Sequence, residues 1–239
     1  MMPQVIVFRG KNKQICQTDD PDVYLTVFTD EATAYDGLKR RIIPGKGALH
    51  CSICTRLFEL LEENGVHTHF IGTDGECGML IRKVEMLPVT VVVRNIAAGA
   101  ICERLGVARG KQFRVPITEF HMKSDLLGHP MVNESQLEAL EILDEDTLDE
   151  MRRIALRINA LLQHYLFPRG MELIDFRTEF GRDGDRLVVT DELTPATCRL
   201  RESGTGEELD MDLFRNEMGD ILAAYNDLGR RLLFEECGD

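Results

Sequence analysis

Apolar residues recur at helical spacing in three segments of the chain. The first segment covers residues 49–61 and is followed by Asn64-Gly65, a pair that commonly ends helices. The second covers residues 151–165 and follows residues 147–150, Thr-Leu-Asp-Glu, which have the pattern of a capping box. The third covers residues 214–232. Each segment places its apolar side chains on one face, so the pattern predicts three amphipathic helices.

Short runs of β-forming residues, separated by turn residues, predict strands in two parts of the chain. They cover residues 4–8, 24–29, 78–84 and 89–96, and then residues 172–176 and 186–193 around a turn at residues 182–185. The run at residues 89–93 is apolar enough to be buried on both faces. Residues 97–105 predict a short helix closed by Gly106, and residues 113–145 are expected to be irregular. This order indicates an α+β protein with two lobes and a cleft that suits a ligand.

Charge and composition exclude several partners. The 239 residues carry a formal net charge of −13, and the lysines and arginines are scattered rather than clustered. A nucleic-acid surface needs clustered positive charge, so we expect no nucleic-acid partner. No apolar run approaches the ~18 residues of a membrane span and no signal peptide is evident, so we expect no membrane partner and a cytoplasmic location. An anionic substrate would need a local cationic pocket in this acidic chain.

The cysteines and histidines do not form a recognisable metal or disulfide pattern. The chain has seven cysteines at irregular spacing, which argues against a disulfide framework. Cys51 and Cys54 form a C-x-x-C pair, and His67 and His69 flank one residue, but no second pair stands at zinc-site spacing. We therefore interpret these four residues as structural.

A basic turn is the first candidate for chemistry. Gly10 in the sequence Gly10-Lys11-Asn12-Lys13 would let the backbone approach a phosphate closely, and the two lysines share a face if the segment is extended. By itself the segment fits a solvated basic turn equally well.

Carboxylates and an arginine at strand ends are further candidates. Glu179 and Asp191 end the two strands predicted around residues 182–185, so strand pairing would let them converge on one cation such as Mg²⁺. Arg94 ends an apolar strand before the small residues that open a helix, and both features bind anions. Solvated carboxylates and a packed strand-end arginine remain the alternatives.

The order and spacing of ten short pieces resemble the SAICAR synthetase (phosphoribosylaminoimidazole-succinocarboxamide synthase) family from Arg9 to about Arg231. The pieces are Arg9-Gly10-Lys11-Asn12-Lys13, Ala32-Thr33-Ala34-Tyr35-Asp36-Gly37, Ile43-Pro44-Gly45-Lys46-Gly47, Ile81-Arg82-Lys83-Val84-Glu85-Met86-Leu87-Pro88, Val92-Val93-Arg94-Asn95-Ile96-Ala97-Ala98-Gly99, Arg104-Leu105-Gly106, Pro130-Met131-Val132-Asn133-Glu134, Leu173-Ile174-Asp175-Phe176-Arg177-Thr178-Glu179-Phe180-Gly181, Asp191-Glu192-Leu193-Thr194-Pro195 and Cys198-Arg199-Leu200.

The resemblance implies a fold and a reaction. The fold would have a nucleotide-binding lobe with an antiparallel sheet at residues 1–87, a larger α/β lobe for substrate and metal at residues 88–239, and ATP in the cleft. The enzyme would be an ATP-dependent ligase that forms a C–N bond: Mg-ATP phosphorylates a carboxylate and the amine of aspartate displaces phosphate. Its partner would be a small phosphorylated substrate, and family members often form homo-oligomers.

The resemblance also implies roles for individual residues. The catalytic residues would be Lys11, Arg177 and Asp191. The residues that bind ATP would be Gly10, Lys11, Lys13, Arg82, Glu85, Met86, Glu179 and Asp191, with the stretch 82–86 as the hinge that holds adenine and with Glu179 and Asp191 as the Mg²⁺ ligands. The residues that bind the acceptor substrate would be Asp36, Arg94, Gly99, Lys123, His129, Arg199 and Arg215.

The chain departs from the family pattern at several of its polar positions. The departing residues are His50, Cys51, Ala100, Ser124, His129, Arg177, Ala196 and Arg201. Because an Asp-to-His change removes a carboxylate and Arg does not replace Lys in a tight phosphoryl-transfer site, we expect an altered substrate. That substrate would resemble a phosphoribosyl-imidazole or a purine, as in nucleoside-antibiotic (coformycin- or pentostatin-like) biosynthesis. The alternatives are an orthodox SAICAR synthetase of purine biosynthesis and a nucleotide-binding pseudoenzyme.

Overall fold

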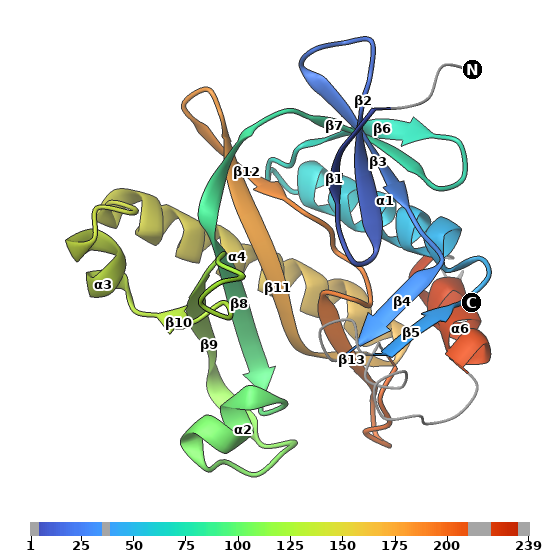
Figure 1. Ribbon diagram of the computed structural model, residues 1–239. Coiled ribbons are helices and arrows are strands. Elements are labelled where there is room, and N and C mark those ends of the chain that lie inside the picture. Colours follow the sequence, from blue (N-terminus) through green and yellow to red (C-terminus); the bar gives the residue numbers. More distant parts are fainter. Residues whose placement is uncertain (1–4, 35–38, 210–220, 234–239) are drawn as a thin grey trace. The chain divides into compact units, whose positions relative to one another are not determined.

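The strand pairs that the structure describes are all antiparallel (Figure 1). The structure is a computed structural model that describes residues 5–34, 39–209 and 221–233. Its chain divides into two units, the first comprising Met1–Val84, Leu193–Ala196 and Glu208–Asp239 and the second comprising Glu85–Glu192 and Thr197–Glu207. Helices packed on antiparallel sheets make this an α+β protein, as the sequence predicts.

The first unit is built on a five-stranded sheet in the order β1-β2-β3-β7-β6, and it also contains a two-stranded sheet of β4 and β5. The strands are β1 (Ile6–Arg9), β2 (Lys13–Gln17), β3 (Val23–Phe28), β4 (Glu31–Ala34), β5 (Lys39–Ile42), β6 (Phe70–Asp74) and β7 (Gly78–Arg82). Helix α1 (Lys46–Glu63) packs on β3, β6 and β7 and buries Ile53, Leu57 and Leu61. Asn64 ends α1, so the predicted helix and its stop are confirmed.

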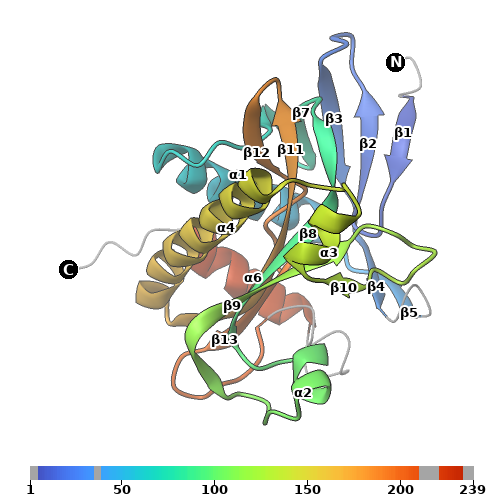
Figure 2. The same ribbon diagram turned by 90° about the vertical axis from the view of Figure 1, so that its left-hand side faces the viewer.

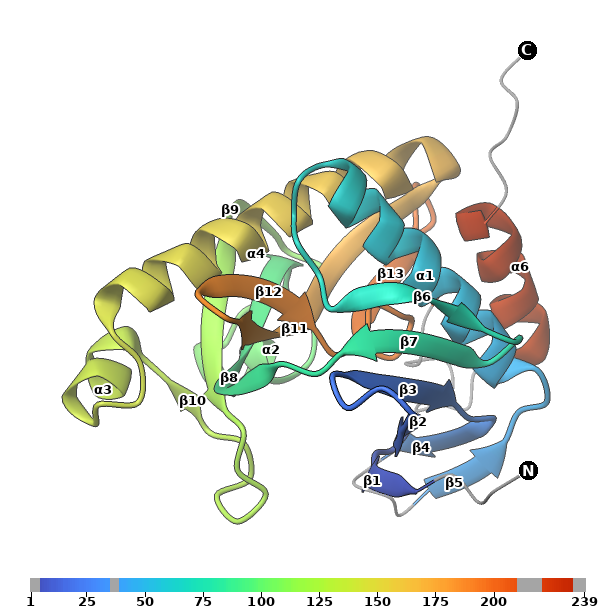
Figure 3. The same ribbon diagram turned by 90° about the horizontal axis from the view of Figure 1, so that it is seen from above.

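The C-terminal helix α6 (Ile221–Leu233) belongs to the first unit, where it packs against α1 (Figure 3). The rings of His50 in α1 and Tyr225 in α6 have centroids 5.5 Å apart, and Tyr225 joins Ala32 and Ile43 in a buried cluster. The sequence interpretation assigned all of residues 88–239 to the second lobe, which is wrong for α6. The apolar stripe of α6 is buried on α1, a helix from the other end of the chain. Residues 214–220 of the predicted last helix lie outside the described residues.

The second unit is built on a six-stranded sheet in the order β10-β9-β8-β11-β12, with β13 also paired to β11. The strands are β8 (Glu85–Ile96), β9 (Gln112–Met122), β10 (Met131–Val132), β11 (Met171–Asp183), β12 (Arg186–Thr190) and β13 (Cys198–Glu202). The long strand β11 pairs with β8 on one side, and on its other side with β13 along its first half and with β12 at its end (Figure 2). β11 is therefore the central strand of this unit.

Helix α4 (Glu145–Leu166) covers one face of this sheet and contacts β8, β9 and β11. Along β8, Val89, Val91 and Val93 are fully buried whereas Thr90 and Val92 are partly exposed. The expectation that residues 89–93 are buried on both faces is therefore wrong: they alternate, and among the described helices α4 is the one that packs along this strand. The opposite face is left for polar side chains.

Two local expectations are also corrected by the structure. Asp144, rather than Thr147, is the N-cap of α4, and its carboxylate accepts a hydrogen bond from the Thr147 amide at 2.7 Å. The segment expected to be irregular contains all but the first residue of the eleven-residue strand β9. Pro116 lies within β9, and because proline is unfavourable inside a strand the sequence pattern did not indicate a strand here. The structure tolerates it because β10 pairs only with Phe120 and His121, which leaves the outer edge at Pro116 without a partner strand among the described residues.

The remaining helices of the second unit are short: α2 (Ala100–Leu105), α3 (Glu134–Ala139) and the 3₁₀ helix η1 (Phe167–Arg169). Gly106 ends α2 in the left-handed conformation, as the sequence predicts, although α2 begins three residues later than expected. In the part of the chain that the structure describes, none of the helices combines the length and the apolar character needed to cross a membrane.

The hairpin of β6 and β7 provides a matched test of packing. A Cβ added to Gly78 would lie 2.1 Å from the Asp74 carbonyl oxygen and 3.2 Å from Leu25 Cδ1, whereas a Cβ added to Gly72 would meet nothing within 4 Å. We expect Gly78→Ala to lower the free energy of unfolding by about 2 kcal/mol because the hairpin must distort. Gly72→Ala should change it by less than about 0.5 kcal/mol. Urea unfolding followed by circular dichroism measures both, and equal effects would contradict this account of the hairpin.

Candidate functional site

Polar side chains line the face of the second sheet that α4 does not cover. Arg94 in β8 lies opposite Asp175 in β11, and Asp175 lies opposite Arg199 in β13. Since alternate residues of a strand share a face, Asp175, Arg177 and Glu179 project from the same side of β11, and Glu119 and His121 project from one side of β9. The pairing of neighbouring strands thus brings these side chains together across the sheet.

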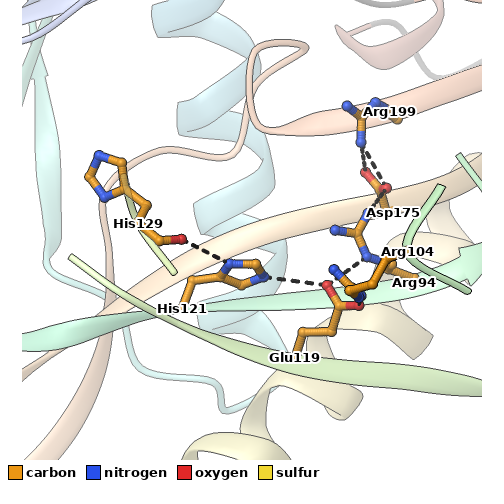
Figure 4. A network of polar contacts seen from close by, with 7 residues as sticks. All are labelled: Arg94, Arg104, Glu119, His121, His129, Asp175 and Arg199. Atoms are coloured by element: carbon orange, nitrogen blue, oxygen red, sulfur yellow. Dashed lines mark hydrogen bonds and ion pairs between the residues drawn. The ribbon is translucent and has the colours of Figure 1, made fainter. Parts of the chain in front are cut away.

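The Arg94 guanidinium is the centre of a buried network of charges (Figure 4). Its Nε lies 2.8 Å from Oε2 of Glu119 and its Nη1 lies 2.7 Å from Oδ2 of Asp175. All three side chains are at most 7% exposed. Buried charges are stable only when they are paired and hydrogen bonded, and here each carboxylate holds the guanidinium from a different strand.

Three further residues join this network. Arg104 of α2 forms an ion pair with Oε1 of Glu119, and Arg199 Nη1 lies 2.9 Å from Oδ2 of Asp175. His121 Nε2 lies 3.3 Å from Oε2 of Glu119, and its Nδ1 lies 3.4 Å from the carbonyl oxygen of His129. Burial alone would raise the pKa of Glu119. The hydrogen bond from His121 and the charges of Arg94 and Arg104 outweigh burial and lower that pKa to about 2.

Two of the arginines in the network reach the surface. The side chains of Arg104 and Arg199 are 32% and 26% exposed, whereas Arg94 is buried. The three guanidiniums outnumber the carboxylates of Glu119 and Asp175 by one charge. Gly99 lies against this surface: a Cβ added to it would come 3.2 Å from Arg199 Nη2. Guanidiniums held in place by buried carboxylates bind phosphate or carboxylate with little reorganisation, so this face suits an anionic ligand.

Of the predicted metal ligands, Glu179 lies in β11 and Asp191 directly follows the neighbouring strand β12. Glu179 pairs with Thr190 across the β11–β12 ladder, and Asp191 follows Thr190 directly. Both residues are partly exposed. The Glu179 carboxylate contacts the Lys123 ammonium and lies 3.5 Å from Thr90 Oγ1. The Lys123 ammonium is thus paired with the Glu179 carboxylate, so the site beside this carboxylate accommodates a positive charge.

The Gly10-to-Lys13 segment is a turn rather than an extended segment. The Gly10 amide donates to the Lys13 carbonyl at 2.9 Å, and the turn joins β1 to β2. Lys11 is exposed while Lys13 is buried, so the prediction that the two lysines share a face through extended geometry is wrong. The hydrogen bond between Gly10 and Lys13 closes a turn, so the two lysines do not alternate as they would in an extended strand.

The other predicted site residues lie as follows. Arg82 ends β7, Glu85 and Met86 begin β8, and the N-terminal segment of the first unit ends at Val84, inside the predicted hinge. Arg177 is exposed on the site face of β11. His129 stands in the loop after β9 with its Nε2 2.9 Å from Oδ1 of Asp125. Asp36 and Arg215 lie outside the described residues.

Sequence reasoning missed the residues that organise the site. Glu119 and Asp175 link the arginines, and Arg104 was assigned no role. One signal was available: charged residues at alternate positions within otherwise apolar strands, as in Asp175-Phe176-Arg177-Thr178-Glu179. The pattern indicates a polar face but not which strands share it.

Several departures from the family pattern turn out to be packing residues. His50 and Cys51 are buried in α1, where Cys51 Sγ lies 3.4 Å from the Gly78 carbonyl oxygen. Cys54 is buried in the same helix, so the structural interpretation of the C-x-x-C pair is confirmed. Arg201 Nε lies 2.7 Å from Oε2 of Glu172. These three departures therefore say nothing about an altered substrate.

The network of arginines and the neighbouring carboxylates form a polar face that suits anionic ligands together with a cation. The family model of SAICAR synthetase matches residues 6–232. The phosphoribosylaminoimidazole-succinocarboxamide synthase of Coprothermobacter proteolyticus is 44% identical over 229 residues, which are 95% of this chain and 97% of that protein. The corresponding synthase of Pyrococcus abyssi is 41% identical over 98% of this chain and 99% of its own length.

Solved structures agree with the sequence comparison. A SAICAR synthetase in complex with ADP superposes with a TM-score of 0.92 at 38% identity, covering 97% of this chain and 99% of its own. The SAICAR synthetase of Pyrococcus horikoshii gives a TM-score of 0.89 at 38% identity, covering 95% of this chain and all of its own. The chain belongs to the SAICAR synthetase family. It has that fold and is an ATP-dependent ligase that forms a C–N bond.

The shifted pKa of Glu119 predicts a pH dependence of stability. Because this pKa falls from an ordinary 4.5 to about 2 on folding, the stabilisation is complete above pH 4.5 and is lost as pH falls toward 2. We expect Glu119→Gln to lower the free energy of unfolding at pH 7 by about 3–5 kcal/mol, since Arg94 loses a buried partner. The difference between wild type and variant should shrink between pH 4.5 and pH 2.

Urea unfolding over this pH range checks the prediction. Glu138→Gln, which changes an exposed carboxyl group on α3, is the control and should follow the wild type. A difference between wild type and Glu119→Gln that does not depend on pH would mean that the ionisation of Glu119 does not stabilise the fold.

Proposed function

We propose that this chain catalyses the reaction of its full-length relatives, in which ATP drives the joining of aspartate to carboxyaminoimidazole ribotide. The observation that carries the proposal is the buried network in which Glu119 and Asp175 hold three arginines on one face of the sheet. Two of those guanidiniums reach the surface, which fits a phosphoribosyl substrate and a dicarboxylic amino acid. The likeness to an ADP-bound SAICAR synthetase supports ATP as the nucleotide.

The proposed chemistry begins with activation of a carboxylate. An unactivated carboxylate is a poor acyl donor because oxide is a poor leaving group. The γ-phosphoryl group of ATP passes to a carboxylate oxygen of the ribotide and ADP leaves. The amine of aspartate then attacks the carbonyl carbon, the C–O bond to phosphate breaks, and the amine loses a proton as the amide forms. Positioning and charge neutralisation supply most of the catalysis in such steps.

We assign the residues of this chain to the two halves of the reaction. Lys11 and Lys13, with Gly10, hold the ATP phosphates, and Arg82, Glu85 and Met86 hold adenine. Arg94 orients Arg199 through Asp175, and Arg177 stands exposed on the same face, where its charge can oppose that of the transferring phosphoryl group. The remaining acceptor-side residues in this proposal are Asp36, Gly99, Lys123, His129 and Arg215.

Mg²⁺ fits the carboxylates of Glu179 and Asp191. Mg²⁺ in nucleotide sites is held by one or two carboxylates with phosphate oxygens and waters, and when bound it neutralises charge on the phosphates. These two residues are one position apart in register across a β-ladder, and Glu179 already contacts the Lys123 ammonium. We propose that they hold the metal and that Lys123 turns to the phosphates or the substrate.

The orthodox reaction accounts for the observations better than an altered substrate does. Three of the departures from the family pattern, His50, Cys51 and Arg201, are explained by packing and ion pairing within the fold, so they do not support a new substrate. Relatives that match nearly the whole chain carry the name of the orthodox synthase. Neither antibiotic biosynthesis nor a pseudoenzyme finds support in these observations.

Product formation tests the proposal directly. The purified protein is incubated with Mg-ATP, aspartate and carboxyaminoimidazole ribotide, and mass spectrometry follows the succinocarboxamide product while a coupled assay follows ADP. We expect one ADP for each product molecule, and growth of a purine auxotroph that lacks its own synthase. ADP release without product would point to a different amine, and neither ADP nor growth would overturn the proposal.

Asp191 offers a sharper test of the metal assignment. Its backbone has φ 67°, a left-handed conformation that Asn tolerates better than Ala, so Asp191→Asn removes the charge with little strain. We expect this variant to lose at least about 100-fold in kcat because a metal ligand is lost. Asp185→Asn, in the exposed turn of the same hairpin, is the control and should keep wild-type activity. Full activity of Asp191→Asn would remove Asp191 from the site.

We also propose that the chain forms a homo-oligomer, as members of its family often do. Analytical ultracentrifugation at micromolar concentration should give a mass that is a multiple of the 27.1 kDa chain. A single species at the monomer mass would overturn this assignment.

A further inference from the structure

Lys46 is the most deeply buried lysine that the structure describes and has no role in the proposed chemistry. It is the first residue of α1 and is 1% exposed. Its ammonium lies 3.0 Å from the Glu31 carbonyl oxygen, 3.2 Å from the Thr29 carbonyl oxygen and 3.4 Å from Asn12 Oδ1. An ammonium has three protons to donate, and burying it is costly unless they are accepted. The contacts of Lys46 meet that requirement.

The three acceptors join parts of the first unit that are distant in sequence. Thr29 lies in the turn between β3 and β4 and Glu31 is the first residue of β4, whereas Asn12 belongs to the turn of Gly10 to Lys13 that carries the proposed phosphate-binding lysines. Thr29 also reaches that turn directly: its amide donates to the Asn12 carbonyl at 2.9 Å and its hydroxyl donates to the same oxygen at 3.1 Å. The Gly10-to-Lys13 turn is therefore anchored at Asn12 by both Thr29 and Lys46.

The start of α1 is shaped to hold this ammonium in place. Gly45, before Lys46, has φ 83°, and the Asp30 carboxylate accepts from the amides of Gly45 and Gly47 at 3.2 Å and 2.8 Å. A Cβ on Gly47 would lie 2.8 Å from the Phe28 carbonyl oxygen, so the β3–β4 turn lies directly against the helix start. Lys46 is thus fixed from both sides, and its head group has little freedom to leave Asn12.

His50 lies one helical turn after Lys46 and is also buried. Burial is the largest influence on the nearby His50 and lowers its pKa well below the usual value, and the charges of Lys46 and Lys13 lower it further. A neutral His50 adds no positive charge beside the two ammonium groups. A charged Lys46 donates stronger hydrogen bonds than a neutral amine would.

We propose that Lys46 is a positioning residue for the nucleotide, whose buried ammonium holds the Gly10-to-Lys13 turn in the arrangement that receives the ATP phosphates. The inference rests on the proposed function in that it takes this turn as the phosphate site. Lys46 acts through Asn12 and does not touch the nucleotide itself. Without the anchor, the turn must be ordered when the nucleotide binds, and that cost weakens binding.

The test compares ADP binding and stability in matched variants. Lys46→Met keeps the length and apolar stem of the side chain but removes the ammonium, and Asn12→Ala removes only the side-chain acceptor on the turn. Calorimetry with Mg-ADP should give a Kd about tenfold higher for either variant, as expected for the loss of a hydrogen bond to a charged group. The double variant should bind ADP with the same Kd as the single variant that binds less tightly, because both substitutions remove the same hydrogen bond.

A control separates anchoring from general loss of charge or fold. Arg40→Met removes a positive charge from a side chain that is 68% exposed and pairs with Glu31 in the same region, and it should bind Mg-ADP like the wild type. Asn12→Ala leaves the contacts of Lys46 with Thr29 and Glu31 intact, so it should weaken ADP binding without a large change in thermal stability. If Lys46→Met does not fold, Asn12→Ala still tests the hydrogen bond between Lys46 and Asn12.

The outcomes distinguish this inference from the proposed function. Wild-type Kd values for ADP in folded Lys46→Met and in Asn12→Ala would overturn the positioning role while the proposed reaction stands. Additive effects in the double variant would also overturn it, because Asn12 would then contact the nucleotide independently. If the wild-type protein binds ADP but forms no product, the proposed reaction is wrong and the positioning role of Lys46 stands. A wild type that does not bind ADP overturns both.

Discussion

The candidate site depends on the burial of one guanidinium. Burying the Arg94 guanidinium on an apolar strand would be costly without the carboxylates of Glu119 and Asp175, which lie 25 and 81 residues away in sequence. Once those carboxylates are in place, they also hold Arg104 and Arg199, whose outer parts reach solvent. A buried charge thus sets the positions of two exposed ones. That arrangement suits the recognition of anions because the donors are aligned before the ligand arrives.

The strands that carry this network also carry the core of the second unit. On β11, Phe176 and Phe180 are fully buried on the face that α4 covers, while Asp175, Arg177 and Glu179 stand on the other. The same alternation runs along β8, where Val91 and Val93 are buried and Arg94 joins the site. Packing on one face therefore fixes the side chains of the other, and the site inherits the rigidity of the core.

The two units solve the problem of a buried cation in different ways. Arg94 is neutralised by carboxylates, which leaves a charged surface around it, whereas Lys46 donates to two backbone carbonyl oxygens and an amide oxygen. The first solution builds an electrostatic site. The second adds to the hydrogen bonds that Thr29 donates to the Asn12 carbonyl oxygen, and so it helps to order the turn next to β2. Both rely on hydrogen-bond geometry that a surface ion pair would not provide.

Local pattern determined much of this protein from the sequence alone. The amphipathic helices α1 and α4, the β11–β12 hairpin and the glycine that ends α2 follow from side-chain period and turn chemistry, which depend on neighbours in sequence. The family motifs identified the fold, and among the polar residues of the site face they pointed to Arg94, Arg177 and Glu179 but not to Glu119 or His121. The sequence also overstated the meaning of its departures, since a list of substitutions does not distinguish a buried His50 from a residue that meets substrate.

Tertiary structure decided what depends on distant partners. No local signal pairs Arg94 with Glu119 and Asp175, joins Lys46 to Asn12, or returns α6 to the first unit, because each contact links residues far apart in the chain. Pro116 concealed β9 for the same reason, since only the finished sheet shows that its outer edge needs no donor there. Residue types and their period set the elements. The pairing of those elements set which charges meet, because the cost of burying a charge is settled only when its partners are in place.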